Sequence, residues 1–94
     1  MPKLLTSKEI QRGLESLKGW QHRGRFLTKT FRFDEFMDGI SFLNRVARVA
    51  ERQEHHPDVK VRYARVTLAL QTHSMGGVTV WDVGLARAID RIEV

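Results

Sequence analysis

Three of the four histidines in this chain of 94 residues gather around one short stretch of sequence. His55 and His56 are adjacent and are followed at once by Pro57, and His73 comes sixteen residues after that proline. Glu51 stands four residues before His55. Because histidine has an unperturbed pKa of roughly 6.5, its side chain can give and take protons near neutral pH. The cluster therefore suggests general acid–base chemistry.

The same histidines have to be weighed as metal ligands and as residues without a function. Zinc motifs that use two histidines of one helix place them four residues apart. Adjacent His55 and His56 would point about 100° apart on a helix, so one small metal ion is hard for both to reach. Pro57 pushes the residue before it out of the helical region, so we expect the pair at a helix exit, where two rings can line one cleft. Spacing alone leaves all three interpretations open.

Composition indicates one small globular domain over residues 1–94. A chain of this length buries only about 60–65% of its unfolded surface, which leaves nothing for a second core. The chain has no cysteine, so neither disulfides nor thiolate metal sites can stabilise it, and nothing indicates an oxidising compartment. No stretch approaches the roughly 20 apolar residues of a membrane span, and no apolar run of signal-peptide length opens the chain. We expect a cytoplasmic protein.

The net charge of +5 could indicate a nucleic-acid partner. The basic residues are scattered, however, and no aromatic platform for base stacking alternates with them. We therefore expect a solvated basic surface and no binding of nucleic acid. The residues concerned are Arg45, Arg48 and Arg52 on one expected helix, and Lys60, Arg62 and Arg65 on an expected strand and turn.

Local patterns predict three helices that would position the histidines. Residues 6–9 and residues 79–82 both match the capping box, which marks a helix start. A third helix is expected after Asp34, which can cap it, and its apolar stripe continues to about His55. The expected apolar faces are Ile10, Leu14 and Leu17, then Phe36, Ile40, Leu43, Val46 or Ala47, and Ala50, and finally Trp81, Leu85, Ile89 and Ile92.

Alternating apolar residues predict two β-hairpins between these helices. One turns at residues 23–24, and the other at residues 64–65, with His73 in a glycine-containing loop just past its second strand. Because short hairpins make antiparallel pairs, the fold class is α+β, a four-stranded antiparallel sheet with three helices packed on one face. The other face and the edges of that sheet would be poorly covered, which favours a homo-oligomer.

The chain resembles one family, the pterin-4a-carbinolamine dehydratases, also called 4a-hydroxytetrahydrobiopterin dehydratases. Their signature is matched by Glu51, His55, His56, Pro57, Tyr63, His73 and Asp82, and the similarity runs from Gly19 through the final helix. The resemblance implies dehydration of 4a-hydroxytetrahydrobiopterin to quinonoid dihydrobiopterin and water, in the recycling of tetrahydrobiopterin. It also implies a pterin substrate, no cofactor, no metal, and a dimer or tetramer.

The resemblance implies a role for each histidine. His55 and His73 would be acids that face the two sides of the pterin, and His56 would be the base and the main substrate contact. Glu51 would orient or tune His55, since the two stand four residues apart on the expected helix. A surface acid that only balances Arg48 or Arg52 is an equally good interpretation of Glu51.

Three further residues of the signature receive supporting roles. Pro57 would fix the exit of the chain from the helix. Asp82 belongs to the signature, but its place in the capping box favours a structural role. Tyr63, like Trp20 outside the signature, is expected to fill the core, because aromatic residues at strand positions usually do.

Relatives of this family offer a non-enzymatic alternative. Some dehydratase-like proteins are Rubisco assembly factors, and animal members act as dimerisation cofactors of a homeodomain transcription factor. An interaction protein has no reason to keep His55, His56 and His73 together, so this chain is expected to be the enzyme.

Overall fold

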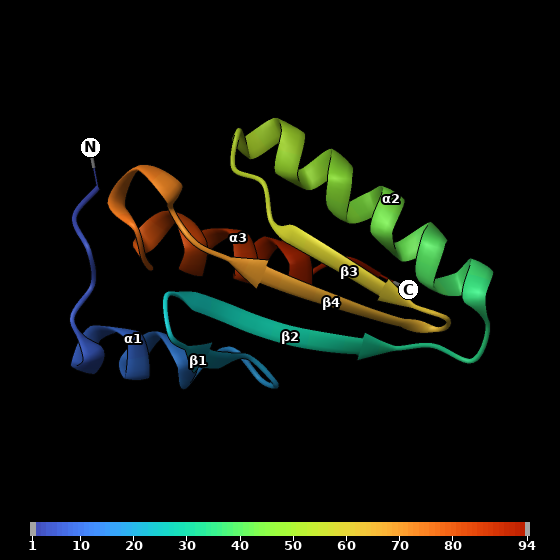
Figure 1. The fold of residues 1–94 in the computed structure, drawn as a ribbon, viewed down its shortest axis with the longest axis horizontal. Helices are drawn as coiled ribbons and strands as arrows, with labels where there is room; N and C mark the ends of the chain where they lie inside the picture. The colour runs from blue at the N-terminus through green and yellow to red at the C-terminus, as the bar shows by residue number, and fades with distance from the viewer. Residues whose placement is uncertain (1, 94) are drawn as a thin grey trace.

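The computed structural model describes residues 2–93 (Figure 1). Within these residues the chain forms three α-helices, four strands and a short 3-10 turn. In chain order they are α1 (Ser7–Leu14), β1 (Gln21–Arg23), β2 (Phe26–Arg32), α2 (Phe36–Gln53), β3 (Asp58–Arg62), β4 (Arg65–Leu70), η1 (His73–Met75) and α3 (Val80–Asp90). Among the described residues no helix is long and apolar enough to cross a membrane.

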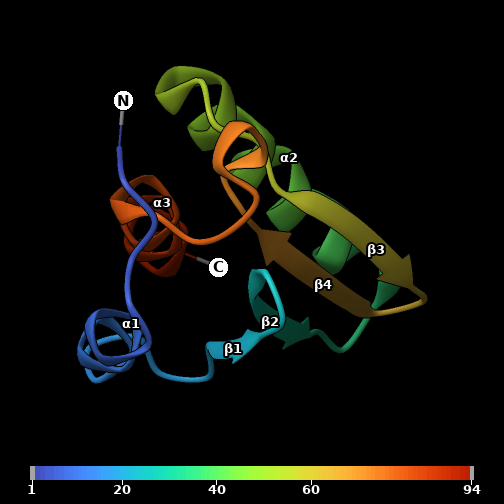
Figure 2. The ribbon, with the colours of Figure 1, turned by 60° about the vertical axis from the view of Figure 1, so that its left-hand side comes forward.

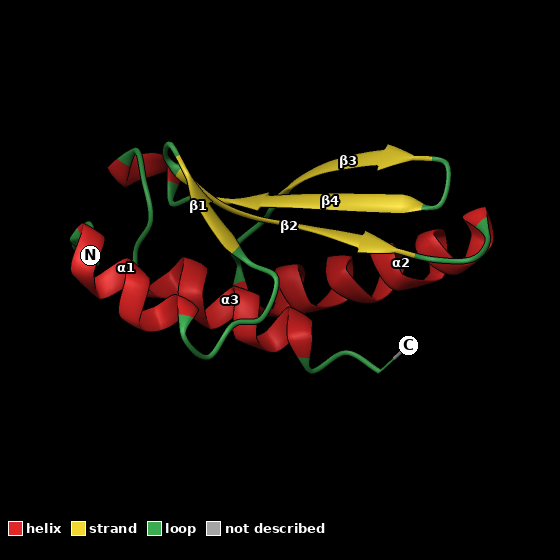
Figure 3. Ribbon diagram, turned by 90° about the horizontal axis from the view of Figure 1, so that it is seen from below, coloured by secondary structure: helices red, strands yellow, loops and turns green. Residues whose placement is uncertain are grey.

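The four strands form one antiparallel sheet in the order β1-β2-β4-β3. Each hairpin supplies two neighbouring strands, and β2 joins β4 to link the hairpins. All three helices lie on the same face of this sheet (Figure 3). The predicted fold class is confirmed.

The core lies between the sheet and its helices. Leu27 of β2 faces it together with alternate residues of β4, and all of them are fully buried. The helices contribute apolar side chains from one stripe each, as the sequence pattern predicts. These core residues are Val66, Leu68 and Leu70 of β4, Phe42 and Val46 of α2, and Leu85, Ala86 and Ile89 of α3.

Both predicted capping boxes are present. At α1 the Thr6 hydroxyl accepts from the backbone N–H of Glu9, 3.2 Å away, and the Glu9 carboxylate accepts from the backbone N–H of Thr6 at 2.8 Å. That backbone hydrogen bond holds the pKa of Glu9 below its ordinary value. At α3 Thr79 and Asp82 repeat the arrangement.

Several helix boundaries differ from the sequence-based expectations. Helix α1 ends at Leu14, and Leu17 is buried in the turns that follow. Helix α2 begins after Glu35 rather than Asp34, and no side chain caps it. Helix α3 ends at Asp90, so Ile92 packs against the core from beyond the helix.

The C-terminal end of α2 decides where the histidines point. The helix ends at Gln53, two residues before the predicted end, because Glu54 adopts a left-handed conformation with φ 52°. The backbone N–H of His55 then bonds the carbonyl of Ala50 at 3.1 Å, as in a Schellman-type helix end. His55 therefore lies outside the helix that was expected to carry it.

Of the two aromatic residues expected in the core, one is buried and the other is not. Trp20 is 5% exposed and its indole N–H donates to Asp90 at 3.0 Å. Tyr63 is 73% exposed, because the second hairpin turns at residues 63–64 rather than 64–65 and places Tyr63 at its tip. The prediction of a core role was wrong for Tyr63.

Candidate active site

Three segments that are separate in the sequence meet at one end of the sheet. They are the exit from α2, the turn that follows β4, and the first turn of α3 (Figure 2). Asp82 of α3 joins them, since its carboxylate binds His55 of the first segment and Thr72 of the second. The junction therefore brings a histidine, a carboxylate and a hydroxyl into one connected network.

The Asp82 carboxylate is wholly buried and fully hydrogen-bonded. Its Oδ2 accepts from the Thr72 hydroxyl and from the backbone N–H of Thr79, both at 2.8 Å, and its Oδ1 lies 2.6 Å from Nε2 of His55. A buried carboxylate needs such partners because burial without them is costly. Asp82 is therefore a helix cap, as predicted, and also the partner of His55.

His55 is fixed in orientation by this contact. Its side chain is only 13% exposed, and the acceptor on Nε2 means that this nitrogen carries the hydrogen of the neutral ring. Nδ1 is then the nitrogen with a free lone pair. Proton transfer at His55 would therefore run through Nδ1, while Asp82 stabilises the positive charge that forms on the ring.

Glu51 binds His56, which corrects the expectation that it would orient His55. The Glu51 carboxylate is the partner of Nε2 of His56. The expectation assumed that the helix continues to His55, whereas the left-handed Glu54 turns the chain first. This pair is exposed, with 61% of the His56 side chain and 75% of the Glu51 side chain accessible. His56, like His55, thus has its Nε2 bonded and its Nδ1 free.

His73 projects from the turn η1 as an exposed side chain. The amide of Gln71 donates to its Nδ1 at 3.2 Å, which leaves Nε2 free to carry and donate a hydrogen. A bridge between Thr72 and Gly77, with the Thr72 N–H 2.8 Å from the Gly77 carbonyl, closes the base of the loop. His73 is therefore exposed to solvent on a loop whose two ends are joined by the bridge between Thr72 and Gly77.

Sequence reasoning missed Thr72 and Gln71. Thr72 is 3% exposed, and its hydroxyl bonds both the Asp82 carboxylate and the Thr79 hydroxyl, the latter at 2.7 Å. Its only signal in the sequence was its place directly before His73. Gln71 holds Nδ1 of His73, and its own Oε1 is buried without a hydrogen-bond partner among the described residues.

Trp81 lies at the surface beside His55, although its spacing predicted a core position. It is 49% exposed, and its ring stands edge-on to the His55 ring with 6.1 Å between centroids. Together with residues of α2 and α3 these two rings line a cavity of about 360 Å³. The other lining residues are Gln53, Glu54, Val80 and Gly84.

A cavity of about 620 Å³ lies at the opposite end of the sheet, and no histidine lines it. Acid–base chemistry requires groups that titrate near neutral pH, so the histidine end is the candidate active site. Pro57, half-buried, leads from His56 directly into β3. Within residues 2–93 no three histidine or carboxylate side chains converge closely enough to hold a metal ion.

Comparison with known proteins gives one consistent family. The sequence profile described as Pterin 4 alpha carbinolamine dehydratase matches residues 3–92. A protein of Sulfurisphaera tokodaii, provisionally named pterin-4-alpha-carbinolamine dehydratase, is 44% identical over 90 residues, which cover 96% of this chain and 97% of the relative. A protein of Koribacter versatilis with the same provisional name is 41% identical over 92 residues, covering 98% of each chain.

Two solved structures share the fold. A transcriptional coactivator/pterin dehydratase from Brucella melitensis superposes with a TM-score of 0.89 at 36% identity, over 94% of this chain and 96% of that one. A pterin dehydratase-like protein identified as a RuBisCO assembly factor in the alpha-carboxysome has a TM-score of 0.66 at 21% identity, over 77% and 86% of the two chains. At that identity the second likeness concerns the fold alone.

Proposed function

Because this chain belongs to the pterin 4 alpha carbinolamine dehydratase family, we propose that it dehydrates a 4a-hydroxytetrahydropterin to the quinonoid dihydropterin and water. The physiological setting would be the recycling of tetrahydrobiopterin in the cytoplasm, by a homo-oligomer. One observation supports the proposal in addition to the similarity to the family. His55 and His56 each bind a carboxylate through Nε2, which fixes the ring and leaves Nδ1 for proton transfer.

The reaction needs two proton transfers. The bond between C4a and the hydroxyl oxygen breaks, and this oxygen leaves as water only if it receives a proton. A proton is lost from the ring nitrogen as the new double bond to C4a forms. Positioned side chains that transfer such protons typically contribute about 10²–10⁴-fold in rate.

The histidines would divide these transfers between them. His55 and His73 would be the acids that protonate the hydroxyl from the two sides of the pterin, and His56 would be the base and the main substrate contact. The bonding of the three rings supports a part in proton transfer for each, since among the described residues each has one nitrogen bonded to the protein and one without a partner. To act as an acid at Nδ1, His55 would have to be in its protonated form, whose charge Asp82 stabilises. Glu51 would orient His56, and Asp82 would orient His55.

The test is an assay of dehydration of a synthetic 4a-hydroxytetrahydropterin, followed by absorbance, with purified protein and EDTA. We expect acceleration that EDTA does not change, and a loss of about 10²–10⁴-fold in His56→Ala. His22→Ala is the matched control, because His22 lies on β1 outside the cluster and should leave the rate unchanged.

Two results would contradict the proposal. A rate abolished by EDTA and restored by zinc would replace acid–base catalysis by histidine with a metal mechanism. A rate no higher than that of buffer would leave a role in protein assembly, such as that of the relative named as a RuBisCO assembly factor.

A further inference from the structure

Three arginines stand side by side in one row across the sheet, at the end away from the histidines. Arg65 of β4 is paired in register with Arg32 of β2 on one side and with Arg62 of β3 on the other. Residues paired in this way project from the same face of a sheet, with Cβ atoms about 4.5–5.5 Å apart. Because Val66, the neighbour of Arg65, is buried in the core, the three arginines project from the other face of the sheet, which the helices do not cover (Figure 3).

The row carries three like charges, and no carboxylate of the described residues forms an ion pair with it. Like charges placed directly opposite each other on neighbouring strands destabilise a sheet. All three side chains are exposed, and within residues 2–93 none of them forms a hydrogen bond or an ion pair through its guanidinium group. The fold therefore gives no reason for this arrangement, whereas an anion bound across the row would.

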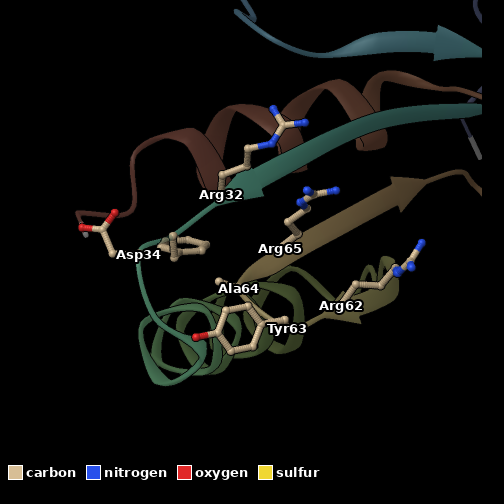
Figure 4. A pocket seen from close by; sticks show the side chains of 7 residues that line it. Arg32, Asp34, Arg62, Tyr63, Ala64 and Arg65 are labelled. Carbon is tan, nitrogen blue, oxygen red and sulfur yellow. The ribbon is translucent and has the colours of Figure 1, made fainter.

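A cavity of about 620 Å³ lies at this row, a size typical of sites for small molecules. Figure 4 shows the guanidinium groups in the order Arg32, Arg65, Arg62 across the strands, and the carboxylate of Asp34 pointing away from them. The cavity is also lined by Phe33 and Ala64, whose backbones are joined by a hydrogen bond of 2.9 Å. The lining thus combines hydrogen-bonded backbone with three exposed cationic groups.

Tyr63 adds an aromatic ring to this cavity. It is 73% exposed, and its backbone is left-handed with φ 48°, a conformation that residues with a bulky side chain rarely adopt. Burial of its ring does not explain its presence at the turn. An exposed ring beside cationic groups provides a surface on which a flat aromatic ring can stack.

We propose that the row Arg32-Arg65-Arg62 binds a small molecule through a group of two or three linked phosphates. Three guanidinium groups spread over two strand spacings, about 10 Å, can bind several phosphate oxygens at once, each through paired N–H donors. Such a group occurs in inorganic oligophosphate and in nucleoside di- and triphosphates. Only a nucleotide also carries a base that could stack on Tyr63.

Other occupants fit the row less well. A second copy of this chain docked through a two-fold axis at this surface would bring arginines against arginines. A single-stranded nucleic acid needs a longer basic track with several stacking rings. The next row of the open face carries Thr30 and Thr67, whose hydroxyls bond each other at 2.8 Å, and Lys60 as its one charged residue. The concentration of charge at one row favours a compact polyanion.

The proposal is tested by calorimetric titration of the purified protein with inorganic tripolyphosphate at about 0.15 M salt, a level that screens weak surface attraction. We expect one binding site per chain, with a dissociation constant of about 1 mM or lower. Arg65→Ala, which removes the centre of the row, should weaken binding about 10- to 100-fold. Dehydratase activity should not change in this variant, because Arg65 lies at the far end of the sheet from the histidines.

Two further variants distinguish binding by the arginine row from general electrostatic attraction and from stacking on Tyr63. Arg48→Ala removes the same charge from an exposed position on α2 and should bind tripolyphosphate as tightly as the parent. Tyr63→Asn keeps the turn, because asparagine tolerates the left-handed conformation. If the site takes nucleotides, this change weakens binding of ATP but not of tripolyphosphate; an equal effect on both assigns the site to inorganic oligophosphate.

Four results would overturn the proposal. They are the absence of tripolyphosphate binding by the parent, an equal loss in Arg65→Ala and Arg48→Ala, binding of citrate as tight as that of tripolyphosphate, and displacement of tripolyphosphate by a single-stranded oligonucleotide at a much lower concentration. The third would assign the row to carboxylates and the fourth to nucleic acid. Circular dichroism of each variant confirms that the fold is retained.

Discussion

Nε2 of His55 lies 2.6 Å from Oδ1 of Asp82, a carboxylate with no exposed surface. The second oxygen of that carboxylate accepts the Thr72 hydroxyl at 2.8 Å, and Thr72 immediately precedes His73. One buried carboxylate therefore orients a histidine directly and anchors the base of the loop that carries another. His55 and His73 reach the site from different segments, and Asp82 connects them, because its carboxylate binds His55 and also Thr72, the residue before His73.

Asp82→Asn should impair both the reaction and the fold. The amide cannot accept hydrogen bonds at its nitrogen, so at least one of the three donors around residue 82 loses its acceptor. We expect a rate loss of about 10²–10⁴-fold, because the His55 ring loses its fixed tautomer. Urea denaturation should show a loss of about 1–3 kcal/mol in the free energy of unfolding. A fully active Asp82→Asn protein would refute the orienting role.

Thr72→Val and Thr72→Ser form a matched pair of variants. Valine has nearly the shape of threonine but no hydroxyl, so Asp82 loses one donor, whereas serine keeps it. We expect Thr72→Val to lower the free energy of unfolding by about 1–3 kcal/mol and also to lower kcat for the protein that remains folded. Thr72→Ser should recover most of kcat. Equal kcat in the two variants would mean that Thr72 serves stability alone.

Glu51→Gln tests the other carboxylate–histidine pair. Because both side chains are exposed, the stability should change by no more than about 0.5 kcal/mol. The rate should fall less than in Asp82→Asn, since solvent can partly replace Glu51 as the partner of His56. Steady-state kinetics and thermal unfolding of the two variants, measured together, check this order. The reverse order of rate losses would contradict it.

The sequence predicts the architecture well because its signals are local. Each capping box lies within four residues, and each hairpin joins strands that are neighbours in the chain. The partners of the histidines were predicted poorly because they depend on one backbone angle. Because the backbone of Glu54 is left-handed, Glu51 contacts His56, and His55 binds Asp82, 27 residues away in the sequence.

Two other features could not be predicted from residue spacing. The bond from Thr72 to Asp82 joins residues ten apart, and the bridge from Thr72 to Gly77 closes the loop between them. The row of arginines depends on strand register, since a hairpin turning one residue later would have moved Tyr63 inward and changed the partners of Arg65. The predicted turn at residues 64–65 was displaced by one residue, and with that register the three arginines would not have been paired across the strands.

The open sheet predicts self-association. Strand β3 lies at an edge of the sheet, and the side chain of its Val59 is 45% exposed. Such edge strands are usually paired or covered in solution. Light scattering at micromolar concentration should therefore give the mass of a dimer or tetramer. A monomer mass of 10.9 kDa would count against this prediction.

The measurement that tests the central claim most directly is the single-turnover dehydration of the two 4a stereoisomers by three variants. If His55 and His73 protonate the hydroxyl from opposite sides, His55→Ala and His73→Ala should each slow mainly one isomer, by about 10²–10⁴-fold. His56→Ala should slow both isomers and weaken pterin binding. Equal, small losses on both isomers for His55→Ala and His73→Ala would contradict the account and reduce these histidines to binding residues.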